Sequence, residues 1–461
     1  MTLANIEKKS RELRTLIRNA KPVLDIKGTT YYVSAEGCDQ NDGKTPETAW
    51  QTPNAVNDNR TKLQPGDAVL FRCGDIFRGR FEMARGVTYS SFGEGDKPEL
   101  WGADENAAEL EWKKEEQENV YSLQMPHSID IGNIVFNHGE EWGIKHLMEI
   151  DPELEMDLDY ILDKDTHILY LYSEFGNPSE RWEDIELCVN KTMIRGNAND
   201  VTIDGLVLKY GAAHGIGTDS IDYTDPEKPA NKGLKNFTIR NCEFEWIGGG
   251  IQFRTTRFGN AFEIWGGCDN LVFENNYINQ VYDAGVTQQY SGVNWNKDLP
   301  VKVTNTVMRN NLIENCTYSY EYFLTEFQIN GPTRHARVEP TEFGFENVTF
   351  ENNICRMAGY GWGDQRPDQS TPCHLKSWGH TNNSKNFVMK NNIFDRCDFR
   401  LIEINATNDD CVPALDGNVY CQYQGKEIVN ANGKKSVMSR ETIERNQTLT
   451  EENATFVFTK R

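Results

Sequence analysis

One short pattern recurs through the second half of the chain and limits the folds that this sequence can adopt. Each copy is an alternating apolar and polar run that leads into Asn, and the copies read FTIRNCEF, LVFENNYI, TVMRNNLI, VTFENNIC and FVMKNNIF. The repeated positions are Asn241, Asn275, Asn310, Asn352 and Asn391, which are 34 to 42 residues apart. A period of this length is typical of solenoids and propellers, and the alternation indicates a strand in each copy.

The order of the turn signals separates these two architectures. A propeller blade needs several hairpins per repeat, whereas here a strand, a corner, a second strand and a loop follow one another. Asn tolerates the left-handed backbone of a sharp corner, and stacked Asn side chains can hydrogen-bond from coil to coil. The repeat therefore predicts an all-β fold, a parallel β-helix.

The rest of the chain divides by pattern around this repeat. Ile6, Leu13, Leu16 and Ile17 form an apolar stripe at helical spacing, so we expect an amphipathic helix over about 4–19 that covers the open end of the coil stack. The expected organisation is an N-terminal capping helix (1–28), first coils (29–102), an inserted β-rich subdomain (103–195), the main β-helix with a cleft (196–425) and a C-terminal cap or tail (426–461).

Charge and composition restrict the partners. The net charge of -22 disfavours nucleic acid and anionic membranes as partners. The 11 Cys are scattered, which favours free thiols over a disulfide framework. No apolar run is long enough to span a bilayer, and the charged N-terminus does not read as a secretory signal. We therefore expect a cytoplasmic protein, or a secreted one if a leader has been trimmed.

The opening YYVSAEGCDQNDGKTPETAWQT and the strand-Asn-Asn coils resemble the right-handed parallel β-helix proteins of the pectin-lyase-like superfamily, over about residues 29–425. That superfamily includes glycoside hydrolases, polysaccharide lyases, epimerases and carbohydrate-binding proteins. The resemblance implies a right-handed winding and a carbohydrate partner, and it does not choose among these activities.

Three acidic residues are the candidates for catalysis. In FEIW, Phe262 and Ile264 are expected to point inward, which turns Glu263 and Trp265 outward as a carboxylate beside an aromatic plate. Such a pair suits a sugar, which stacks on the indole while an acid protonates the glycosidic oxygen. The alternative is that Glu263 only solvates an exposed strand.

Asp283 and Glu321 come from the next two coils and complete the carboxylate cluster. Acids one coil apart would have roughly the separation of a retaining pair, and acids two coils apart roughly that of an inverting pair. The sequence leaves the stereochemistry open. The alternatives are a corner role for Asp283, which would bond its own backbone, and an inward position for Glu321.

A wider set of residues is expected to bind substrate. His214 is similar to the His-Gly of polygalacturonases, but the paired aspartates of that family are missing here, so its catalytic set is not transferred. His374, Lys376 and Trp378 alternate on one strand and are expected to face the cleft. The full set of expected binding residues is His214, Trp265, Gln288, Trp362, Asp364, Arg366, His374 and Lys376. For His214 the alternative is a packed residue, and for Asp364, Arg366, His374 and Lys376 it is ordinary surface polarity.

Neither a metal nor a cofactor is indicated. The turn DQNDG at 39–43 could hold calcium, although Asp and Asn at a turn need no ion. Zinc-ligand spacing, phosphate-binding loops and dinucleotide fingerprints are absent from the sequence.

The leading hypothesis is a glycoside hydrolase that uses a carboxylate pair on the β-helix face. A polysaccharide lyase or epimerase is the main alternative, with Lys376, an Arg or a His removing the proton next to a uronate. The scarcity of Lys and Arg on the expected face, apart from Arg254, Arg257 and Lys376, counts against it. A carbohydrate-binding protein without catalysis is the third reading.

Overall fold

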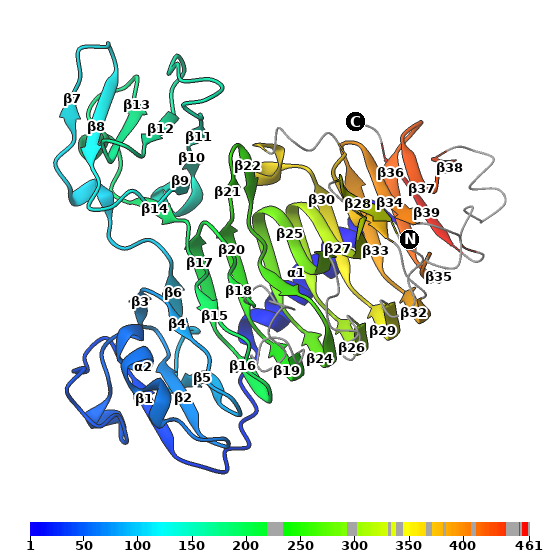
Figure 1. The fold of residues 1–461 in the computed structure, drawn as a ribbon, viewed down its shortest axis with the longest axis horizontal. Coiled ribbons are helices and arrows are strands. Elements are labelled where there is room, and N and C mark those ends of the chain that lie inside the picture. Colours follow the sequence, from blue (N-terminus) through cyan, green and yellow to red (C-terminus); the bar gives the residue numbers. More distant parts are fainter. Residues whose placement is uncertain are drawn as a thin grey trace.

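The computed structural model describes residues 1–218, 234–292, 302–330, 333–337, 344–365, 371–380, 384–406, 412–438, 451 and 454–459. Short parallel strands stack into three sheets along an elongated body (Figure 1). The first sheet contains, in order, β1 (Thr30–Val33), β2 (Ala68–Arg72), β5 (Thr88–Phe92), β16 (Val201–Asp204), β19 (Leu234–Arg240), β24 (Cys268–Glu274), β26 (Lys302–Arg309), β29 (Gly344–Glu351), β32 (Lys385–Lys390) and β35 (Ala414–Asp416).

Two further sheets share the long strands β25 (Tyr277–Gly292) and β27 (Leu312–Asn330), which pass from one sheet into the other. The second sheet also contains β3 (Ile76–Arg78), β6 (Glu99–Trp101), β17 (Val207–Gly211), β20 (Glu243–Ile247), β30 (Ile354–Ala358), β33 (Ile393–Cys397), β36 (Val419–Tyr423) and β39 (Thr455–Thr459). The third also contains β4 (Phe81–Glu82), β15 (Ile194–Arg195), β18 (Ile216–Gly217), β23 (Phe262–Trp265), β31 (Cys373–His380), β34 (Arg400–Ala406) and β37 (Glu427–Ala431), with β38 (Lys434–Val437) antiparallel to β37.

Each strand pairs in parallel with the equivalent strand of the next coil, and the core lies between the three sheets. Inward side chains stack along it, as where Phe262 lies 6.1 Å from Phe237 and 5.4 Å from Phe273 between ring centroids. Coils that pair edge to edge around a common core form a parallel β-helix, the architecture that the repeat predicts. The right-handed sense stays a prediction.

Asn side chains make the corners between the first and second sheets. The five repeated positions named above have φ between 55° and 57°, the left-handed conformation that Asn tolerates. The next residue along is a buried Asn in four of these coils, and its Nδ2 donates to the Oδ1 of the Asn one coil further on at 2.9–3.2 Å. This row consists of Asn276, Asn311, Asn353, Asn392 and Asn418, and the last of them donates to the carboxylate of Glu451 at 3.1 Å.

The expected N-terminal helix exists as α1 (Leu3–Asn19), but its position differs from the prediction. Ile6 and Ile17 pack against an apolar row at the start of successive second-sheet strands, which consists of Tyr277, Leu312, Ile354, Ile393 and Val419. The helix therefore lies along the side of the stack, as Figure 1 shows, and the prediction that it covers an open end is wrong. The physical reason is that this outward apolar row needs a cover along several coils.

A different helix lies at the edge of the third sheet. In α2 (Pro53–Asn59), the Asn57 side chain accepts from the backbone N–H of Glu82 at 2.8 Å and donates to the carbonyl of Arg80 at 2.9 Å. These bonds occupy the N–H of Glu82 in β4, the first strand of that sheet, and the carbonyl just before the strand, and so protect this edge.

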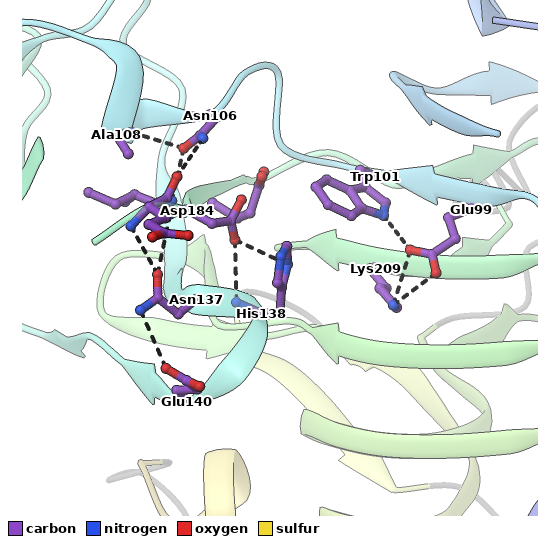
Figure 2. Close-up of polar contacts among 12 residues, drawn as sticks. Glu99, Trp101, Asn106, Ala108, Asn137, His138, Glu140, Asp184 and Lys209 are labelled. Carbon is purple, nitrogen blue, oxygen red and sulfur yellow. Dashed lines mark hydrogen bonds and ion pairs between the residues drawn. The ribbon is translucent and has the colours of Figure 1, made fainter. Parts of the chain in front are cut away.

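A second body of strands is inserted between β6 and β15 and has its own core around Trp112, Tyr160 and Trp182. Its elements are β7 (Lys113–Lys114), β8 (Val120–Gln124), β9 (Ile131–Phe136), β10 (Glu141–Trp142), β11 (Ile144–Lys145), β12 (Asp159–Asp163), β13 (Ile168–Tyr172), α3 (Pro178–Arg181) and β14 (Ile185–Val189). Figure 2 shows polar contacts on both sides of the junction: in the coils Lys209 donates to Glu99 at 3.1 Å, and in the inserted body Asn106 accepts from the backbone N–H of Ala108 at 3.0 Å.

The remaining short elements are the hairpin β21 (Gly250–Phe253) and β22 (Thr256–Phe258), the strand β28 (Thr333–Arg337) and 3-10 turns at Pro46–Thr48, Arg60–Lys62, Ala107–Glu109, Asn137–Gly139 and Gly361–Gln365. Among the helices in the described ranges, none is long and apolar enough to cross a membrane.

Candidate functional site

A pocket of about 310 Å³ opens on the outer face of the third sheet, and we call it the carboxylate pocket. Strands β23, β25, β27 and β31 form its floor, and the hairpin β21–β22 forms one wall. Its lining residues are Gln252, Thr256, Arg257, Phe258, Asn260, Glu263, Trp265, Asp283, Gln289, Glu321, Phe323 and Trp378. All three acids that the sequence suggested for catalysis, and the two suggested indoles of Trp265 and Trp378, therefore meet in one pocket.

Strand register places two of these acids on one row. Glu263 pairs with Thr287, Thr287 pairs with Glu321, and Glu321 pairs with Lys376. Their neighbours Phe262 and Ile264 lie in the core, so Glu263 faces outward as expected. Glu263 and Glu321 are thus two strand spacings apart, which is about 10 Å between their Cα atoms.

Glu263 is held by two donors on a single oxygen. His214 Nε2 lies 2.6 Å and Asn260 Nδ2 lies 3.1 Å from its Oε2. The backbone N–H of Asn260 donates to His214 Nδ1 at 3.2 Å, so Nδ1 is an acceptor and the ring proton belongs on Nε2, where it points at the carboxylate. His214 is therefore placed as a donor that orients Glu263.

Glu321 accepts on both oxygens. Thr287 Oγ1 donates to Oε2 at 3.0 Å, and the indole Nε1 of Trp378 donates to Oε1 at 2.5 Å. Donors on both oxygens favour the ionised carboxylate. Only 4% of Glu321 is exposed, and that fraction opens on the pocket.

Asp283 lies on β25, one strand from Glu263, where the strand bulges between Val281 and Ala284. Asn260 connects the two acids, because its Oδ1 accepts from the backbone N–H of Ala284 at 2.9 Å while its Nδ2 bonds Glu263. The bulge and Asn260 together bring a third carboxylate to the pocket.

The hairpin wall is tied to the inserted body. Arg257 donates to the carbonyls of Gly249 at 2.9 Å and Gly132 at 3.2 Å, and Asp130 accepts from the backbone N–H of Ile251 at 2.7 Å. Asp130 also pairs with Lys145 at 2.6 Å, and burial lowers the pKa of that lysine to about 8. Contacts with the insertion therefore fix one side of the carboxylate pocket.

Three of the expected binding residues lie inside the protein, so the expectation that they face the cleft is wrong for them. Gln288 is aligned with the core residues Ile264 and Tyr322, and it accepts from the hydroxyl of Tyr320 at 2.9 Å. The next residue, Gln289, faces the pocket instead.

His374 is fully buried, because its ring stacks on Phe394 inside the coil and bonds Ser319 Oγ at 2.9 Å. Trp362 is also fully buried, against Tyr282. Two consecutive residues of β31, His374 and Leu375, are packed inside the protein, so simple alternation fails at the start of this strand.

The remaining candidates lie at or beyond the pocket edge. Lys376 is only 1% exposed, pairs with Glu403 at 3.2 Å and lies over the Trp378 ring at 4.0 Å, so its charge is already engaged. Asp364 is exposed on a 3-10 turn outside the pocket lining. Arg366 lies outside the described residues.

The sequence did not single out Asn260, Phe258 or Gln289 as functional residues. Asn260 stands three positions before Glu263, and a polar residue just ahead of an outward carboxylate was the available signal. Phe258 and Gln289 could not be found in this way. Phe258 belongs to the hairpin wall, and the outward direction of Gln289 depends on how β25 pairs with its neighbours, so both are properties of the fold.

Metal binding has no clear candidate in the described part of the chain, which contains no group of three His, Cys, Asp or Glu placed to hold an ion. In the 39–43 turn, Asp39 accepts from the backbone N–H groups of Gln51 and Thr52, and Asp42 accepts from Thr48 Oγ1. These carboxylates stabilise their own turn.

The chain is similar to some known proteins, but these similarities do not assign it to a family. No family model matches the chain. The lacto-N-biosidase of Bifidobacterium longum is 31% identical over 102 residues, which are 20% of this chain and only 6% of that protein. Among solved structures, XylC with xylose has a TM-score of 0.49 at 11% identity, over 89% of this chain and 73% of that chain.

A GH136 lacto-N-biosidase from Eubacterium ramulus has a TM-score of 0.42 at 13% identity, over 99% of this chain and 70% of that chain. A rhamnogalacturonan lyase has a TM-score of 0.41 at 12% identity, over 92% and 86%. The strand pairings themselves define the class of this protein, a parallel β-helix with a carboxylate pocket on one face.

Proposed function

We propose that this chain is a glycoside hydrolase whose catalytic groups are Glu263 and Glu321. The observation that carries the proposal is that two outward carboxylates share one pocket from strands two spacings apart, with the indoles of Trp265 and Trp378 beside them. Oxocarbenium-like chemistry needs an acid and a base on opposite sides of a sugar, and indoles provide the surface on which a pyranose stacks.

The hydrogen bonds favour different roles for the two acids. Glu321, with donors on both oxygens, is suited to remain a carboxylate and act as the base on water. Glu263 accepts both of its donors on Oε2, so Oε1 is the oxygen that we assign to deliver a proton to the leaving oxygen. A spacing of two strands leaves room for that water, as inverting enzymes require.

Asp283 supports a second stereochemical route. It lines the same pocket from the strand next to Glu263, four positions before Thr287, the residue that pairs with Glu263, and it would act as the nucleophile of a retaining enzyme. Determination of the product anomer by NMR at early times separates the routes: inversion assigns Glu321 as base, and retention assigns Asp283 as nucleophile.

The local similarity to a lacto-N-biosidase supports a carbohydrate substrate. The lyase alternative is weaker at the carboxylate pocket, because Arg257, the one cation in its lining, bonds two carbonyls and the neighbouring Lys376 pairs with Glu403. It predicts an unsaturated product that absorbs in the near ultraviolet.

The test is incubation of the full chain with neutral oligosaccharides, uronic-acid oligosaccharides and a lacto-N-biosidase substrate, followed by assays for new reducing ends and for ultraviolet absorbance. The Glu263→Gln variant should lose turnover, and Glu47→Gln, an exposed acid far from the pocket, should not. Wild-type turnover in Glu263→Gln, or absorbance in place of simple hydrolysis, contradicts the proposal.

A further inference from the structure

A second and larger pocket adjoins the carboxylate pocket on the same sheet. It measures about 430 Å³, and its lining residues are Asn57, Arg80, Phe81, Glu82, Asn190, Lys191, Thr192, Arg195, Ala213 and Phe258. Phe258 lines both pockets, and Ala213 precedes His214, the partner of Glu263. The two pockets are therefore neighbouring parts of one surface.

Register aligns the second pocket with the catalytic row. Arg195 pairs with Gly217, and Gly217 pairs with Glu263, so Arg195 lies on the same row two strands before Glu263. This spacing is about 10 Å between Cα atoms, a length that a disaccharide can span. Gly217 has no side chain to block the row, and a Cβ there would lie 3.1 Å from the Cβ and Cδ2 of His214.

The charge of the second pocket is opposite to that of its neighbour. Three cations (Arg80, Lys191 and Arg195) line it with one carboxylate, Glu82, which is 3.4 Å from Arg60. The carboxylate pocket has the reverse balance, three acids and one arginine. This cationic site contrasts with the net charge of the chain, which is -22. The local electrostatic field, and not the net charge, determines which ligand group binds there.

The individual side chains are suited to an anion. Lys191 and Arg195 are both exposed, so they can reach a ligand in the pocket. Arg80 is held in place by the carbonyl of Gly102 at 2.5 Å and by Asp104 at 3.2 Å. Asn190 and Thr192 add polar groups beside Lys191. Guanidinium and ammonium donors bind carboxylate and sulfate oxygens through charge-assisted hydrogen bonds.

We infer that this second pocket, the cationic pocket, binds the acidic group of a sugar unit, a carboxylate or a sulfate ester, in a glycan whose neighbouring unit lies at Glu263. The position of the cleaved bond rests on the proposed function, whereas anion binding rests on the cationic pocket alone. The substrate class is then an acidic glycan, read by Lys191 and Arg195.

The experiment measures the binding of three sugars to the full chain by ligand-observed NMR titration: glucuronic acid, glucose 6-sulfate and uncharged glucose. The same titrations are made with the Lys191→Gln/Arg195→Gln variant and with Lys44→Gln/Lys113→Gln, which removes two exposed lysines elsewhere. Because all four side chains are exposed, the variants should fold, and their unfolding midpoints check this.

We expect one or both acidic sugars to bind more tightly than glucose and to lose about tenfold or more in affinity in the pocket variant, but not in the control. Preference for glucuronic acid assigns a uronate, and preference for glucose 6-sulfate assigns a sulfate ester. Equal binding of charged and neutral sugars, or equal binding by both variants, overturns the inference.

The Glu263→Gln protein separates this inference from the proposed function. It should bind the acidic sugar as the wild type does while it hydrolyses nothing. Binding that depends on Lys191 and Arg195 without hydrolysis of any glycan by the wild type would reject the function and keep the cationic pocket. Hydrolysis of a glycan without selective anion binding would keep the proposed function and reject the cationic pocket as an anion site.

Discussion

Two rows of polar side chains run along the same stack of coils and have different roles. In the buried Asn row at the first corner, each member uses the next as its partner, and the row ends on Glu451. In the outward row through Arg195, Gly217, Glu263, Thr287 and Glu321, several polar groups open on pockets. A closed polar row stabilises the coil, whereas an open row presents its polar groups to the pockets.

The largest expected effect tests the open row. Glu321→Gln should lower kcat/KM on the cleaved glycan by about 10²- to 10⁴-fold, because it removes the base but keeps the shape of the side chain. The unfolding midpoint should stay close to the wild-type value. Steady-state kinetics and thermal unfolding measure the two quantities, and Glu346→Gln on the first sheet is the control. A large loss of stability with little loss of turnover would assign Glu321 to the structure.

The next largest effect tests the closed row. Asn353→Ala removes the acceptor for two bonds from Asn311 and the donor to Asn392 and to the carbonyl of Met308. The free energy of unfolding should fall by about 3 kcal/mol, because buried partners lose their hydrogen bonds. Urea unfolding measures it, and KM of the folded fraction should not change.

Asn347→Gly is the matched control for that variant, because glycine keeps the left-handed φ of 57° at this exposed corner. A loss equal to that of Asn353→Ala would mean that corners in general, and not the buried row, stabilise the stack.

A third prediction concerns a buried polar group that belongs to neither row. Burial lowers the pKa of His374 to about 4, whereas the unfolded chain titrates near 6.5. Between pH 6.5 and 4 only the unfolded state binds the proton, so this group lowers stability by up to about 1.4 kcal/mol per pH unit as the pH falls.

Urea unfolding of the wild type and of His374→Gln at pH 7, 5.5 and 4.5 measures this effect. The stability advantage of the wild type over the variant should shrink toward low pH. A difference that stays constant over this range would show that the imidazole is already protonated or exposed.

The smallest effect sharpens the comparison within one strand. Gln288 and Gln289 are neighbours on β25, but the first faces the core and the second the carboxylate pocket. Gln288→Ala should lower the free energy of unfolding by about 1 kcal/mol and leave KM unchanged. Gln289→Ala should raise KM about fivefold, which is roughly 1 kcal/mol of binding, and leave stability unchanged. The opposite pattern would mean that the strand register is shifted by one.

Local rules predicted the parts of the site that lie on straight strands. Glu263 and Trp265 flank Ile264, a core residue, so period-2 alternation was enough to turn them outward. The same rule failed for His374, which stacks inside on Phe394 although the next residue, Leu375, also lies in the core. The alternation of inward and outward side chains breaks down wherever a strand bends or bulges.

The repeat, the Asn corners and the outward acids could be read from the amino-acid sequence, because each depends on the conformation of a few adjacent residues. Other features appear only in the folded chain: α1 lies along the side, the hairpin wall is tied to Asp130, and Arg80, Lys191 and Arg195 gather beside the carboxylate pocket. These features join residues far apart in the chain, and their proximity follows from strand register and packing, which no local pattern encodes.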